Sequence, residues 1–232
     1  MTATAANPKS ITIRGRLSFP VFEHAMAVER NKTSKFPKAS DKEVATEFNL
    51  LIEADQFEKL RKHLLEVFIP YVEERMAAGE KTDVVEPAQI KKLKTMLEPD
   101  GDWLDNPPHL PMKEVSEKNK DNMPEAVASV KVVGPKGADV NLQATVYSAD
   151  QLKVPDADIL QFPVVKPLNE TIFDMYPGAV VGATLNLYAF FNSKAVNGVS
   201  AGGNTAVYLG NFEGERFGGG APAVDLDAIF MD

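Results

Sequence analysis

The chain has 232 residues, of which 44% are hydrophobic and 25% are charged, and this globular composition excludes a wholly disordered protein. It contains no cysteine, which excludes disulfides, a thiolate nucleophile and cysteine-ligated metal centres. The formal net charge of −8 conceals a basic N-terminal region, because the segment from Lys9 to Lys38 holds seven cations and only two acidic residues.

The first element is a predicted strand, Ser10 to Phe19, in which apolar and polar side chains alternate. Its polar face carries Arg14 and Arg16, and Gly15 in its middle predicts a bulge or bend. A polar loop from Arg30 to Lys38 is expected next, with one aromatic among its cations, and a second strand is expected from Thr46 to Glu53.

The pattern then changes to a helical period. Apolar residues recur every three or four positions from Asp55 to Ala78, which predicts an amphipathic helix that Pro70 kinks or splits. A shorter helix is predicted from Pro87 to Leu97. Residues 99–125 contain five prolines and are expected to form a long connection of the kind that is functional or mobile.

The rest of the chain is predicted to be mostly strands. The segments Ala126–Val133 and Val140–Tyr147 are expected to pair through a turn at Gly134–Gly137, followed by strands at Ala179–Asn192 and Asn204–Phe212. The charge-free stretch around the third of these strands alternates with a period of two, which favours a strand over a membrane helix.

Five or six strands and one helical insertion predict a mainly β fold of the α+β class, either a small barrel or a sandwich. We expect one domain over residues 1–212, with the helical insertion at about 55–98 and the proline-rich loop at 99–125. Residues 213–232 are expected to be a Gly-rich linker and a short acidic tail.

Catalysis has little support in the sequence. Gly198–Gly202 fits the G-x-S-x-G pattern, in which Ser200 would be the nucleophile of a hydrolase. That pattern requires a strand-to-helix turn and a later histidine, whereas here a strand is expected to follow and the last histidine is His109. A Gly-rich hairpin loop is therefore favoured. The three histidines are scattered, so neither a metal site nor another cofactor is predicted.

A binding surface has more support. One face of the strand Ala179–Asn192 combines small polar residues with Tyr188 and Phe190, as a platform for stacked bases requires. The alternative, left open, is that these rings pack beneath the helical insertion. The candidate phosphate-binding residues are Arg14, Arg16, Arg30, Lys32, Lys35, Lys38 and Lys131; the candidate stacking residues are Phe36, Tyr147, Tyr188 and Phe190.

The order of three segments resembles bacteriophage single-stranded DNA-binding proteins. These segments are Tyr176–Asn192, Asn197–Ser200 and Gly214–Gly219. The resemblance implies an OB-type barrel of five or six strands that binds single-stranded DNA without sequence preference and without catalysis. It also implies a role in phage DNA replication or recombination, in the cytoplasm of the infected bacterial host.

Such proteins often end in an acidic tail with a terminal aromatic that recruits replication partners. The residues that match in kind are Asp225, Asp227, Ile229, Phe230 and Asp232. A frayed terminus explains the same residues equally well. The alternative function is that of a phage structural or assembly protein with a β-sandwich, in which the charge-poor hairpin is a subunit contact and no nucleic acid is bound.

Overall fold

The computed structural model describes residues 7–21, 24–35, 37–105, 107–136, 143–146, 164–165, 177–193, 195–203, 205–210 and 217. The strands are β1 (Ser10–Val21), β2 (Ala45–Ile52), β3 (Met112–Lys113), β4 (Ala128–Lys136), β5 (Gln143–Val146), β6 (Val164–Val165), β7 (Val180–Ser193), β8 (Val196–Gly202) and β9 (Thr205–Gly210). The α-helices are α1 (His24–Lys32), α2 (Ala54–His63), α3 (Ile69–Ala77), α4 (Pro87–Met96) and α5 (Glu117–Asn122).

The described strands belong to one mixed sheet whose pairings close on themselves. β1 pairs with β2, β2 with β4, β4 with β8, β8 with β7, and β7 again with β1. Only the β4–β8 step of this circuit is parallel. The remaining strands extend from it, with β3 on β4, and β9, β5 and β6 in order from β7. The prediction of an α+β fold with a helical insertion is confirmed, and a sandwich of two separate sheets is not what forms.

The long strand β7 holds the circuit together. One of its edges pairs with β1 from Val180 to Asn186. Its other edge pairs first with β9, over Val180–Ala183, and then with β8, over Asn186–Ser193. The strand is therefore hydrogen-bonded on both sides over its first half. Its inward residues Val181, Ala183 and Leu185 are fully buried in the core, which is why this face consists of small and aliphatic residues.

The core lies inside this circuit because alternate residues of each strand point inward. The inward residues of β1 and β2 that are almost fully buried are Ile13, Leu17, Phe48, Leu50 and Ile52, and they form one cluster with those of β4, β7 and β8. At roughly 1.5–3 kcal/mol for each large aliphatic or aromatic side chain removed from water, this cluster is the main source of stability.

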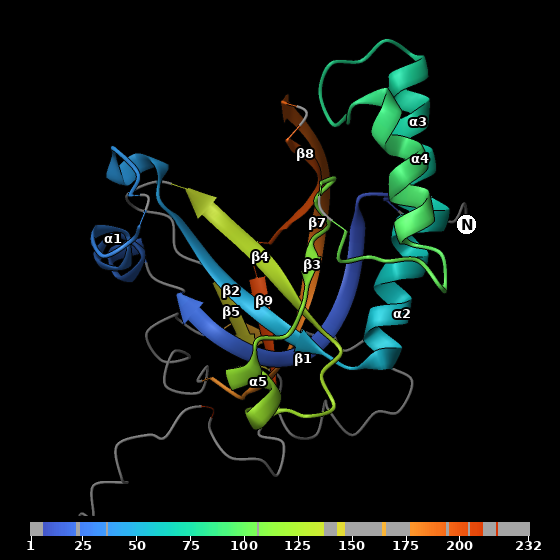
Figure 1. Ribbon diagram of the computed structural model, residues 1–232. Helices are drawn as coiled ribbons and strands as arrows, with labels where there is room; N and C mark the ends of the chain where they lie inside the picture. The colour runs from blue at the N-terminus through green and yellow to red at the C-terminus, as the bar shows by residue number, and fades with distance from the viewer. Residues whose placement is uncertain are drawn as a thin grey trace, which may run out of the picture.

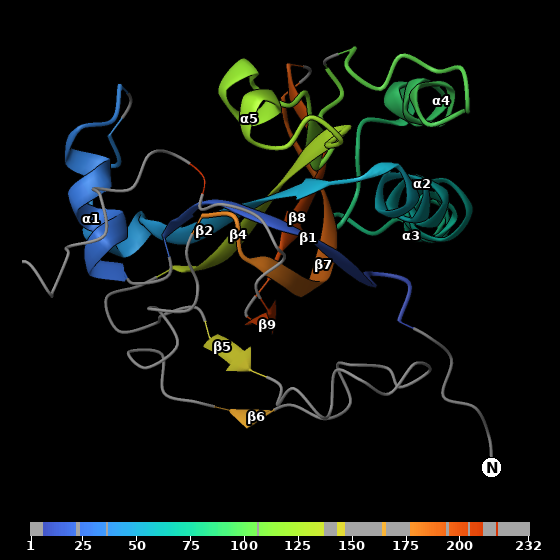
Figure 2. The ribbon, with the colours of Figure 1, turned by 90° about the horizontal axis from the view of Figure 1, so that it is seen from below.

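The helical insertion completes the same core. Leu60, Leu64 and Phe68 are fully buried and belong to the cluster that the strands form. α2 and α3 are joined by a π-helical turn, Leu64–Phe68, in which the backbone N–H of Ile69 donates to the carbonyl of Leu64. Pro70 has no N–H to donate and lies two residues beyond this turn, as the second residue of α3. The predicted disturbance of the helix is therefore found as a π turn just before the proline, and the chain stays helical through Pro70 itself. Figures 1 and 2 show α2, α3 and α4 on one side of the strands and α1 on the opposite side.

Three predictions about the strands are wrong. The expected turn at residues 134–137 is strand as far as Lys136, and β4 pairs with β2, β3 and β8 rather than with β5. β5 instead pairs with β6 and β9. The expected loop at residues 198–202 is part of β8. A glycine in a strand and a glycine in a turn give the same local signal, and only the long-range partner decides between them.

The prediction of a bulge at Gly15 is also wrong. The irregular register in β1 lies between Ser18 and Val21. A Cβ on Gly15 would stand 2.5 Å from the carbonyl oxygen of Leu51 on the neighbouring strand, so this position needs glycine for the close approach of two backbones.

The proline-rich segment is not one continuous loop. It contains β3 and α5, and it places Val115 and Met123 against the outward side chain of Leu51. One helix was missed entirely, because α1 buries only His24 and Ala27 and so lacks the apolar stripe from which helices are predicted.

We expect acid to destabilise this fold partly through His63. This ring is half-buried on α2, and its Nε2 lies 3.0 Å from the carbonyl oxygen of Pro8. Burial holds the pKa of His63 below its usual value of about 6.5, although the hydrogen bond to Pro8 acts in the opposite direction. The neutral ring is therefore favoured in the folded chain, so its stabilising contribution is complete above about pH 6.5 and is lost as the pH falls below that value.

The measurement is the melting temperature at pH 7.5 and pH 5.5. His63→Gln should lose less stability between these two pH values than the wild-type chain does. Equal losses in the two chains would contradict the assigned role of His63.

Candidate nucleic-acid interface

The outer face of β7 carries the polar and aromatic residues that the sequence placed there. Thr184 and Asn186 are exposed, and Tyr188 and Phe190 are half-buried. The two rings lie 6.5 Å apart between centroids and are tilted by 51°. Among the described residues, the partly buried rings that pack on the core come from Phe57, Tyr71 and Trp103. The alternative that Tyr188 and Phe190 pack beneath the helical insertion is therefore not supported.

Sheet register places Tyr188 in a row with a cation. Tyr188 pairs with Ser200 on β8. The next residue of β8, Ala201, pairs with Val132 on β4, the residue after Lys131. The N–H of Lys131 itself donates to the carbonyl of Pro111, just before β3. Lys131 in turn pairs with Asn49 on β2. Adjacent strands are about 4.8 Å apart, so Tyr188 and Lys131 are separated by about 10 Å on one continuous outer surface.

A second row begins at Phe190 and contains a residue that sequence reasoning missed. Phe190 pairs with Gly198 on β8, and the backbone of His109 continues the ladder beside Gly198. The N–H of His109 donates to the carbonyl of Asn197 at 2.9 Å, and the N–H of Val199 donates to the carbonyl of His109 at 2.8 Å. The imidazole then stacks on Phe190, with ring centroids 6.1 Å apart and an interplanar angle of 20°.

These contacts make His109 the third ring of an aromatic group with Tyr188 and Phe190. Its position in a proline-rich segment gives no periodic signal, so only the structure brings it to the strands. All three rings are half-buried, so part of the group remains exposed on the outer face.

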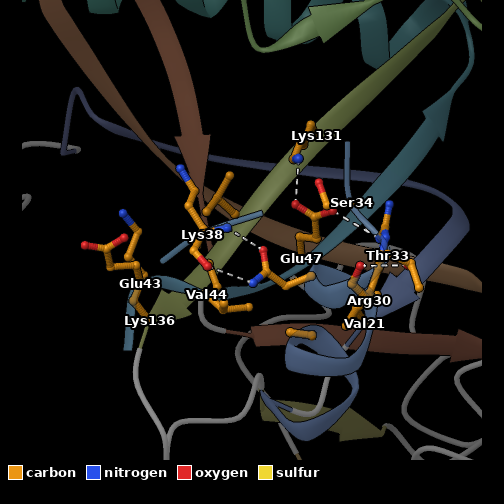
Figure 3. A pocket seen from close by; sticks show the side chains of 14 residues that line it. Val21, Arg30, Thr33, Ser34, Lys38, Glu43, Val44, Glu47, Lys131 and Lys136 are labelled. Carbon is orange, nitrogen blue, oxygen red and sulfur yellow. Dashed lines mark hydrogen bonds and ion pairs between the residues drawn. The ribbon is translucent and has the colours of Figure 1, made fainter. Parts of the chain in front are cut away.

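A pocket of about 640 Å³ lies beyond Lys131, between α1 and the outer faces of β2 and β4. Figure 3 shows Glu47 between Lys131 and Arg30. One carboxylate oxygen lies 2.6 Å from Lys131 Nζ and the other 3.1 Å from Arg30 Nη1. The pocket also contains Lys38 and Lys136. Lys136 was not among the predicted phosphate-binding residues, because the sequence placed it in a turn and not at the end of a strand.

The helix that sequence reasoning missed is what positions Arg30. Ala27 of α1 packs against Val21 and Val44 in a small apolar cluster, which holds the helix on the ends of β1 and β2. The loop after it is closed by the side chain of Asn31, which accepts from the N–H of Lys38 at 2.8 Å and donates to its carbonyl at 3.2 Å.

Arg14 and Arg16 lie elsewhere. Arg14 pairs with Gly182, six residues before Tyr188, so it is separated from that ring by about 20 Å along β7. Both arginines line a second pocket of about 280 Å³, whose rim includes Glu53, Asp55 and Glu125. The structure thus divides the predicted cationic surface into two separate regions.

Both arginines also have partners within the chain. Arg14 lies 3.5 Å from Asp55, whose pKa is lowered first by a hydrogen bond from the Gln56 side chain and less by the charge of Arg14. Arg16 donates from Nε to the carbonyl of Gly178 at 3.0 Å and covers the ring of Phe217 at 4.4 Å. Part of the predicted C-terminal linker is therefore held against β1.

The other predicted residues are distributed as follows. Lys32 is exposed and forms an ion pair with Glu29 one turn earlier, and the hydrogen bond to Glu29 raises the pKa of Lys32. Lys35 is exposed in the segment after α1. Phe36, Tyr147 and the tail residues Asp225, Asp227, Ile229, Phe230 and Asp232 lie outside the described residues.

The hydrolase hypothesis fails on local structure. Ser200 lies inside β8, paired with Tyr188, and not on the strand-to-helix turn that a nucleophile elbow requires. In the part of the chain that the structure describes, no cluster of three or more His, Asp or Glu residues could hold a metal ion. None of the described helices has the length and apolar character needed to span a membrane.

Compared by sequence, the chain matches no protein-family model and none of the curated proteins. Compared by structure, it is similar to bacteriophage single-stranded DNA-binding proteins. The protein of bacteriophage Enc34, solved in complex with single-stranded DNA, is 12% identical with a TM-score of 0.46, and the match covers 90% of each chain. A C-terminal truncation of that protein is 12% identical with a TM-score of 0.48, and 89% of each chain is covered.

Gp2.5, the single-stranded DNA-binding protein of bacteriophage T7, is 12% identical with a TM-score of 0.38, over 88% of this chain and 93% of that one. The resemblance indicated by the sequence is therefore the one that the structure comparison returns.

We expect Gly198 to be essential for the aromatic group. Its φ is +141°, and a Cβ there would stand 2.2 Å from the carbonyl oxygen of His109 and 2.4 Å from its nitrogen. Gly198→Ala should therefore push the His109 segment off β8 and cost about 2 kcal/mol or more in the free energy of unfolding.

Gly202→Ala is the matched control on the same strand and face, because its Cβ would come no closer than 3.4 Å to any neighbour. Chemical denaturation of both variants checks this. Equal losses of stability would contradict the role of the close approach at Gly198.

Proposed function

We propose that this protein binds single-stranded DNA without sequence preference, across the outer faces of β7, β8 and β4. The observation that carries the proposal is that Tyr188 of β7 and Lys131 of β4 stand on the outer faces of strands that both pair with β8, through Tyr188–Ser200 and Val132–Ala201. Two strand spacings correspond to about 10 Å. Binding a single strand without reading its sequence needs flat rings for the bases and cations for the phosphates, and this surface offers both.

The proposed path runs from the aromatic group to the pocket beside α1. Bases stack on Tyr188 and Phe190, with His109 as the neighbouring ring. The backbone phosphates then meet Lys131 and the cations of the pocket, which are Arg30, Lys38 and Lys136. Four such contacts give an attraction that depends on salt but not on base identity.

The architecture supports the finer proposal of an OB-type barrel. Five strands close a circuit, and a helical insertion packs against its core. In OB folds the outer face of adjacent strands and the loops beside it bind single strands. The surface described here also lies on the outside of adjacent strands.

The biological setting is proposed from the sequence resemblance. It comprises phage DNA replication or recombination in the cytoplasm of the infected host, and recruitment of replication proteins by the acidic tail at residues 225–232. Arg14, Arg16, Lys32 and Lys35 belong to the proposal as a second group of phosphate contacts. The variants below distinguish this group from the path over β4.

The salt dependence of binding tests the path. With about four phosphates neutralised, the logarithm of the affinity for oligothymidine should fall with the logarithm of salt concentration at a slope of about −3. Lys131→Ala should make this slope shallower by about 0.7. Arg14→Ala removes one charge of the second group, so it makes the slope shallower only if that group also contacts phosphates. Lys91→Ala, at an exposed position of α4 outside both groups, is the control in which the slope should be retained. A slope near zero in the wild-type chain would contradict phosphate binding altogether.

Replacement of Tyr188 tests stacking separately. Tyr188→Ala should weaken oligothymidine binding by about 1–3 kcal/mol and leave the salt slope unchanged, because a ring and not a charge is lost. The control is Phe191→Ala on the same strand, since Phe191 is 47% exposed but alternation directs it away from the aromatic face. Fluorescence titration measures both affinities. An equal effect of the two variants would contradict a role specific to the Tyr188 face.

A further inference from the structure

Glu47 occupies an unusual position for an acidic residue. It is the carboxylate at the centre of the pocket beside α1, and both of its oxygens are engaged by cations from different elements. Arg30 comes from α1 and Lys131 from β4, so the carboxylate joins a helix to the sheet (Figure 3). A guanidinium and an ammonium that converge on one small anion form the arrangement that also binds the oxygens of a phosphate group.

The rest of the pocket fits the remainder of a nucleotide. Its volume of about 640 Å³ lies in the range of small-molecule sites. Its apolar lining comes from the aliphatic side chains of Val21, Val44 and Val133 and from two alanines, and it could cover a sugar or one face of a base.

The pocket has more cationic than acidic side chains, and only some of its cations are paired. The ionisable groups that line it are Arg30, Lys38, Lys131, Lys136, Glu43 and Glu47. Lys38 and Lys136 form no ion pair with the residues that the structure describes. With Glu47 in place, two of the four cations are already engaged, and a phosphate that enters must displace the carboxylate from them.

We propose that this pocket binds one nucleotide unit of the DNA through its phosphate, and that Glu47 holds the phosphate position until the DNA displaces it. This inference rests on the proposed function, which it deepens by naming one subsite and its internal competitor. Glu47 thereby lowers the affinity for DNA, because a phosphate must displace its carboxylate from Arg30 and Lys131 before it can bind there.

Glu47→Gln is the direct test. It preserves the size of the side chain but removes the charge, so it should tighten oligothymidine binding about fivefold at low salt, the factor that one unit charge at about 4 Å contributes in water. Glu47→Asp retains the charge and should bind with nearly the wild-type affinity.

The matched control is Glu73→Gln on α3. Glu73 pairs with Lys94 at 2.7 Å, and its exposure and that of its partner resemble those of an ordinary surface pair. This variant changes the net charge by the same amount away from the pocket, so its affinity should stay at the wild-type value. Melting temperatures of all variants verify that each chain is folded.

Thymidine 5′-monophosphate, with thymidine as the control that lacks a phosphate, identifies the subsite directly. In an NMR titration the nucleotide should shift the backbone amides of residues 27–34, 44–47 and 131–134, more strongly in Glu47→Gln than in the wild-type chain, whereas thymidine should not.

The outcomes separate the two proposals. If oligothymidine binds the wild-type chain, but Glu47→Gln behaves like Glu73→Gln and the nucleotide leaves these amides unshifted, the subsite is refuted and the proposed function stands. A Glu47→Gln affinity below the wild-type value would also refute the competitor role, because Glu47 would then be orienting the cations. If oligothymidine does not bind, both proposals fail, even where the nucleotide shifts the amides, because the subsite is proposed for a nucleotide of the DNA.

Discussion

The structure depends on the pairing of β1 with β7, two strands that lie far apart in the sequence. Seven register pairs, from Ser10–Asn186 to Arg16–Val180, turn a row of strands into a closed circuit. Without this pairing β1 and β7 would each have an edge of unpaired backbone groups. The core inside the circuit would then be exposed to solvent between these two strands. The surface proposed for DNA lies on the outside of the same circuit, so its geometry follows from the closure.

The strands and helices could be predicted from the sequence where a periodic pattern indicates that one side of the element is buried. The alternation of Ile11, Ile13 and Leu17, and that of Tyr188 and Phe190 with their buried neighbours, correctly assigned the faces of β7 and of β1 as far as Leu17. The alternation fails at the next two residues, where the register of β1 is irregular: Ser18, predicted on the polar face, is buried, and Phe19, predicted on the buried face, is 48% exposed. The helical insertion followed from its three- and four-residue spacing, and its interruption followed from the missing N–H of Pro70.

The rest could not be predicted because it depends on contacts between distant segments. β8 was mistaken for a loop because Gly198 and Gly202 stand on its outer face, and the physical need for Gly198 is the backbone of His109, about ninety residues earlier. In the same way, Arg14 and Arg16 follow the basic pattern of the N-terminal region, yet the fold places them beside Glu53, Asp55 and Glu125. Charge along a sequence does not reveal which acids the fold will bring near it.

The pairing of β4 with β8 is the shortest step of the circuit. The other four steps of the circuit have between four and seven register pairs each. β4 meets β8 through only two, Val132–Ala201 and Val133–Gly202, because β3 pairs with the other part of this edge of β4. Because this pairing, here called the seam, has the fewest hydrogen bonds to break, we expect the two strands to separate there first when the fold fluctuates. The seam lies between Tyr188 and Lys131, so its widening would lengthen the span between rings and cations and let the same surface follow strands with different base spacing.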